Sequence, residues 1–192
     1  MTRFLGILVV LAVAVVWAGC QKKPAGVGSS GHATPEAAFQ SLKQATDKQD
    51  WRAAAQNLVP ESQVPLAFAL VMKTSFSTFG DAAKEKSLNE LLTRHGLNLD
   101  DDAEVGGEDD LDQHLQEMFK SVSNIPALIG DLGDWSKLHA ADGANDKFLQ
   151  LGALSDVKTE GDKATGSVAT EGGPMPIEFR KSASGWLVHL PN

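Results

Sequence analysis

Cysteine and tyrosine are the scarcest residues of this 192-residue sequence, which contains one cysteine and no tyrosine. A single cysteine cannot form a disulfide within the chain, so stability must come from the packing of the core. Basic residues are also few, since 17 Lys and Arg stand against 25 Asp and Glu, for a net charge of −8. This balance argues against non-specific nucleic-acid binding, which depends on Lys and Arg that neutralise phosphates.

Long apolar runs are also scarce, and the prominent one, FLGILVVLAVAVVW, extends from Phe4 to Trp17. Its 14 residues are fewer than the ~20 that a membrane-spanning helix needs. A basic residue precedes the run and small residues follow it, which is the pattern of a secretory signal peptide. We therefore expect residues 1–19 to be a signal segment.

The cysteine comes directly after this run, in the segment Trp17-Ala18-Gly19-Cys20. This segment resembles the lipobox of bacterial lipoproteins, although leucine is more usual at the position of Trp17. The resemblance implies cleavage before Cys20 and acylation of its sulfur, which would hold the protein on a membrane. An ordinary secretory signal and an uncleaved signal anchor are the alternatives. Cleavage would remove one arginine and no acid, leaving a mature net charge of −9.

Residues 20–33 are rich in glycine and serine and predict a flexible tether. They contain a formal G-x-G-x-x-G match from Gly26 to Gly31, but a dinucleotide fingerprint must follow a strand and open a helix. No such context is present, so no nucleotide cofactor is expected. Attachment through Cys20 would place the following domain in the cell envelope, facing the periplasm or the exterior.

The folded domain is expected to begin at Thr34, because Thr34-Pro35-Glu36 combines a capping hydroxyl, a first-turn proline and an acid. Asp50 then predicts the start of a second helix, with Trp51 facing inward and Pro60 ending it. These two segments form a helical hairpin.

A long helical region follows, with apolar residues at helical spacing in four stripes. We interpret all four stripes as core. They consist of Phe68, Met72, Phe76 and Phe79; Leu88, Leu91, Leu92 and His95, ended by Gly96; Leu111, Leu115, Met118, Phe119 and Val122; and Leu128, Ile129, Leu132, Trp135 and Leu138.

From about Phe148 the apolar period changes to two, which predicts short antiparallel strands joined by glycine turns. Ile177 and Phe179 alternate with Glu178 and Arg180, and the sequence leaves open which pair faces the helices. Helices followed by an antiparallel meander indicate the α+β class.

The opening TPEAAFQSLKQATDKQDW and the closing GDKATGSVATEG and MPIEFRKSASGWLVHLP look like small bacterial lipoproteins with a ketosteroid-isomerase-like, or cystatin-like, fold. The resemblance implies a single domain over residues 34–192, with a helical hairpin packed on a curved antiparallel sheet around a cone-shaped pocket. The helical insertion, about 64–141, is longer than this family usually shows.

Metal and nucleophile motifs are not supported. The acidic stretch 100–112 fails the EF-hand pattern, with Val105 where glycine is required and Leu111 where glutamate is required. Asp110 and His114 could share a helix face, as two ligands or as a surface ion pair. No H-E-x-x-H or G-x-S-x-G sequence is present, so neither a zinc site nor a hydrolase elbow is expected.

Trp51, Trp186 and His189 are the residues we single out for a ligand pocket. Our main hypothesis is a membrane-anchored, non-catalytic domain that binds an envelope protein or a small apolar ligand. The alternative is a small isomerase- or hydrolase-like enzyme with a carboxylate in the cone, although the tyrosine that commonly holds the oxyanion in that family is missing. The enzyme needs an acid or His in a concave pocket. The binding domain should instead show a filled cone and an exposed apolar patch, which we expect on the insertion.

Overall fold

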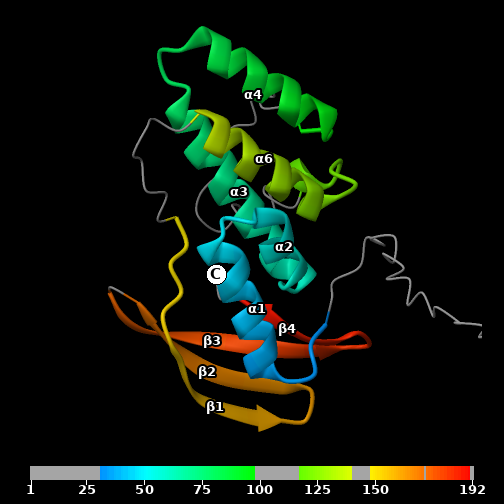
Figure 1. Ribbon diagram of the computed structural model, residues 1–192. Helices are drawn as coiled ribbons and strands as arrows, with labels where there is room; N and C mark the ends of the chain where they lie inside the picture. The colour runs from blue at the N-terminus through cyan, green and yellow to red at the C-terminus, as the bar shows by residue number, and fades with distance from the viewer. Residues whose placement is uncertain (1–30, 98–116, 140–147, 171, 191–192) are drawn as a thin grey trace, which may run out of the picture.

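The computed structural model describes residues 31–97, 117–139, 148–170 and 172–190 (Figure 1). Its helices precede its strands, so the α+β class predicted from the sequence is confirmed. The helices are α1 (Pro35–Asp47), α2 (Trp51–Gln56), α3 (Pro60–Ser77), α4 (Ala82–Arg94) and α6 (Ile125–His139). The strands are β1 (Leu154–Glu160), β2 (Lys163–Thr170), β3 (Gly173–Ser182) and β4 (Gly185–His189), in one antiparallel sheet of order β1-β2-β3-β4.

The first two helices begin where the capping residues predict. The Thr34 hydroxyl accepts a hydrogen bond from the Ala37 amide at 3.2 Å, and the Asp50 carboxylate accepts one from Ala53 at 3.0 Å. Each bond satisfies one of the amides that a helix N-terminus leaves without a partner.

Pro60 does not end α2, as the sequence predicted, but begins α3. The second helix ends at Gln56 because the next residues pair with β4: Val188 donates to the Asn57 carbonyl, and Val59 donates to the Val188 carbonyl, both at 2.9 Å. Proline is well suited to the start of the following helix, where its missing amide has no intrahelical partner to lose.

The strands are joined by short turns at the predicted glycine positions. Gly185 has a φ of 124°, and a Cβ there would lie 2.5 Å from the His32 carbonyl oxygen. Glycine allows this close approach, in which His32 and Trp186 exchange backbone hydrogen bonds of 3.0 and 2.8 Å. The start of the described chain is thereby tied to the edge of β4.

The inner face of the sheet is apolar and lies against α1, which crosses it (Figure 1). Ile177 and Phe179 are buried on this face, whereas Glu178 and the half-exposed Arg180 lie on the outer face. The strand register carries the same alternation across the sheet, since Phe179 pairs with Ala164 on one side and with Val188 on the other. The question that the sequence left open is therefore resolved in favour of the apolar pair.

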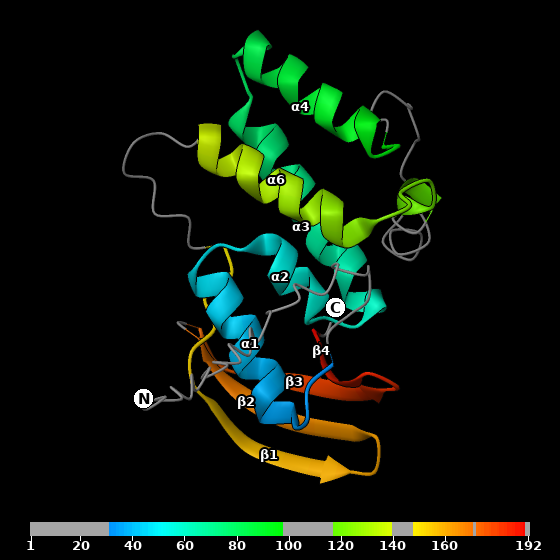
Figure 2. The same ribbon diagram turned by 45° about the vertical axis from the view of Figure 1, so that its right-hand side comes forward.

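A second layer, made of α3, α4 and α6, lies on the side of α1 and α2 away from the sheet (Figure 2). Within it α6 packs against α2, α3 and α4. Gly133 lets α6 approach α2 closely, because a Cβ at this position would lie 2.7 Å from Cγ of Trp51. Trp135 joins α6 to α4 by donating its indole N–H to the Ser87 hydroxyl at 2.9 Å.

Two of the predicted core stripes need correction. Met72 and Phe76 on α3 are 40 and 71% exposed, Phe79 in the turn after α3 is 95% exposed, and Leu138 on α6 is 78% exposed. The face of α3 that packs inward is the neighbouring one, made of Leu66, Ala67, Leu70, Val71 and Thr74. The α4 stripe is buried as predicted at its three leucines, and Gly96, with a φ of 82°, follows the end of that helix. Leu111 and Leu115 lie outside the described residues.

Candidate functional site

The three residues predicted to line a ligand pocket lie in separate parts of the fold. Trp51 is 3% exposed and meets the Phe148 ring edge-on, with ring centroids 5.6 Å apart. Trp186 is buried on the inner face of β4, where the Lys181 ammonium lies 5.9 Å from its ring centroid. His189 lies three residues further along β4, on the outer face. Within the described ranges these side chains line no common cavity.

The inner side of the sheet is filled by side chains instead of enclosing a hollow. Phe39 and Leu42 of α1 and Phe179 of β3 have no exposed surface. In the described parts of β3 and β4, no carboxylate or imidazole lies on this inner face. In the described residues, this face of the sheet is therefore packed against α1 and leaves no hollow between them.

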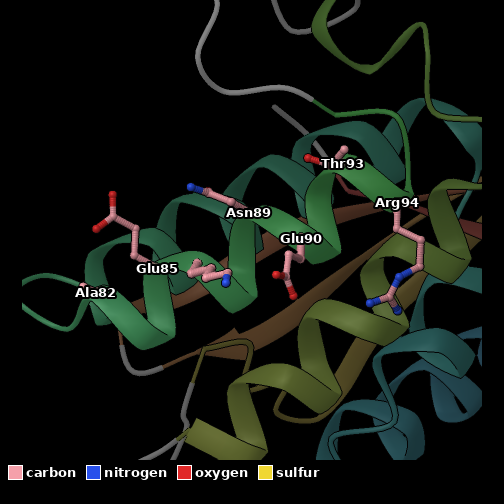
Figure 3. A pocket seen from close by; sticks show the side chains of 7 residues that line it. Ala82, Glu85, Asn89, Glu90, Thr93 and Arg94 are labelled. Carbon is pink, nitrogen blue, oxygen red and sulfur yellow. The ribbon is translucent and has the colours of Figure 1, made fainter.

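A hollow of about 640 Å³ lies beside α4, away from the sheet (Figure 3). The described residues that line it come from one face of that helix alone: Ala82, Glu85, Lys86, Asn89, Glu90, Thr93 and Arg94. A single helix has a convex surface, so these side chains form only one wall, and Figure 3 shows them spread along the helix. They do not converge on a point where a substrate could be held.

A polar cluster on the outer face of the sheet joins it to α3. Arg180 contacts Nε2 of His189 at 3.1 Å and lies 3.8 Å from the Glu61 carboxylate. Because a guanidinium can only donate, Nε2 must accept and the proton lies on Nδ1. That buried Nδ1 has no hydrogen-bond partner and lies 3.5 Å from the Glu178 carboxylate. The cluster fixes the His189 ring, and within the described ranges it places no nucleophile beside that ring.

A second cluster joins three helices through Asp131 of α6. One of its carboxylate oxygens lies 2.5 Å from the Arg52 guanidinium, and the other lies 2.9 Å from Nε2 of His95. A His–Asp pair serves nucleophilic catalysis only beside a nucleophile. Gly96, the residue after His95, accepts a 2.6 Å hydrogen bond from the hydroxyl of Ser121. This hydroxyl proton is used in that bond, so Ser121 does not serve the pair as a nucleophile. We interpret this cluster as a clamp between α2, α6 and the end of α4.

The remaining predicted site residues cannot be placed. Cys20, the acidic stretch 100–112, Asp110 and His114 lie outside the described residues. In the part of the chain that is described, no group of three or more His, Cys, Asp or Glu side chains could hold a metal ion.

The outward face of α3 is the most unusual surface of the described chain. Met72 and Phe76 follow one another on it, Phe79 comes next in the turn that leads to α4, and the exposure increases in this order. Lys73 is turned toward α6, where it donates a hydrogen bond to the Ser136 hydroxyl at 3.3 Å. Neighbouring exposed aromatic and methionine side chains on an uncharged surface are the composition of a protein–protein interface. We call the face made by these three residues the α3 stripe.

No family identifies this chain. No protein-family model matches it, and comparisons with curated proteins and with solved structures likewise found no match. Among the described residues, no helix is long and apolar enough to cross a membrane.

Sequence reasoning found the residues of this stripe but placed them in the core. A signal of their exposure was present in the composition of α3. Between Glu61 and Asp81 the chain has a single charged residue, Lys73, so the helix has apolar residues on nearly all sides. An amphipathic surface helix normally has a charged outer face, and its absence indicates that a second face is available for contact.

Proposed function

We propose that this protein is a membrane-anchored, non-catalytic binding domain that docks another protein through the α3 stripe. The observation that supports it is the exposure of Phe76, at 71%, on a helix whose other face is buried, and of Phe79, at 95%, in the turn that follows this helix. Exposing such side chains to water is unfavourable in an isolated domain, and covering them with a partner removes that cost.

The filled inner face of the sheet supports a binding function over an enzymatic one. Small-ligand and catalytic sites are concave and gather a few polar groups at one point. In the described residues the polar clusters around Asp131 and His189 instead connect secondary-structure elements.

Anchoring through Cys20 is the second part of the proposal, and it would place the domain in the cell envelope. The described chain begins at residue 31, beside the sheet, whereas the turn between α3 and α4 lies at the far end of the helical layer (Figures 1 and 2). A tether of residues 20–30 would then attach the sheet end to the membrane. The α3 stripe would be presented toward proteins beyond the membrane surface.

The anchor is tested by labelling cells that express the full chain with an alkyne fatty acid. We expect label on the wild-type protein and none on a Cys20→Ala variant, which should also leave the membrane fraction. Equal labelling of the two proteins would overturn the lipid anchor.

The binding surface is tested by placing photoreactive p-benzoylphenylalanine at position 79 of the full chain in its own membranes. Position 89, an exposed site on the outer face of α4, is the matched control. We expect a discrete protein adduct from position 79, none from position 89, and loss of the adduct when Phe76→Ser is added. The absence of any adduct from position 79 would count against a docking function.

A further inference from the structure

We draw no further inference here: the strongest candidate, the exposed apolar surface that Met72 and Phe76 form on α3 together with Phe79 in the turn after it, carries nothing beyond the proposed docking function, because nothing in the described part of the structure shows what covers it.

Discussion

The two faces of α3 should respond very differently to the same truncation. We compare Leu70→Ala with Phe76→Ala, two changes on one helix that each remove most of an apolar side chain. Leu70 has no exposed surface, whereas Phe76 is 71% exposed. The comparison therefore asks which apolar face of this helix holds the domain together.

The expected magnitudes follow from burial. Leu→Ala in a packed core costs about 2–5 kcal/mol, through lost burial and the cavity that remains. For Phe76 the buried remainder is about 60 Å² of a side chain of about 200 Å², worth at most about 1.5 kcal/mol at ~25 cal/mol per Å². The better helix propensity of alanine offsets about 0.5 kcal/mol of this loss. We expect Phe76→Ala to lower the free energy of unfolding by less than about 1 kcal/mol.

Urea unfolding followed by tryptophan fluorescence measures both values, because Trp51, Trp135 and Trp186 are all buried and become exposed together. The samples should be dilute, at about 1 µM, so that association does not add to the apparent stability. A loss for Phe76→Ala that equals or exceeds the loss for Leu70→Ala would refute the assignment of the faces. The α3 stripe would then belong to the core, as the sequence first indicated.

Three further substitutions test other parts of the packing by the same urea midpoint. Gly133→Ala should destabilise by about 1–3 kcal/mol despite its better helix propensity, because its methyl group would overlap the Trp51 ring; unchanged stability would refute the close approach of α2 and α6. Asp131→Ala should lower the free energy of unfolding by about 1 kcal/mol, because Arg52 and His95 both lose the carboxylate that they contact, and this loss should shrink in 1 M salt. A loss that does not depend on salt would exclude an ionic clamp. Asp50→Ala should cost about 1 kcal/mol, while Asp50→Asn should retain most of the cap; equal losses would argue against capping.

Local signals were the part of the fold most readable from the sequence. Thr34 and Asp50 each combine a capping oxygen with a helical pattern behind it, and the geometry needed for the bond lies within four residues. The alternation of Ile177 and Phe179 with polar residues likewise reported a strand with one buried face. These features depend on contacts between neighbours in the chain, so they can be recognised without knowing the partner elements.

The predicted pocket shows where such signals stop. Trp51, Trp186 and His189 were selected because large aromatic and imidazole side chains are frequent in binding sites, but the same side chains are equally suited to a core or a hydrogen-bonded cluster. Nothing near Trp51 in the sequence reveals that Gly133, more than 80 residues away, leaves room for its ring. The clamp at Asp131 is invisible for the same reason, since it joins Arg52 and His95 across the fold.

The sequence alone determined the α+β class, the order of helices and strands, the starts of the first two helices and which residues of β3 form its apolar face, because these follow from periodicity and capping along the chain. Only the tertiary structure decided that the apolar pair of β3 faces α1, and that the aromatic stripe of α3 remains exposed. A helix with two apolar faces can bury either one, and the choice depends on which neighbours reach it. Here α6 packs against α3, the face that contains Leu70 is buried, and Phe76 and Phe79 are left to solvent.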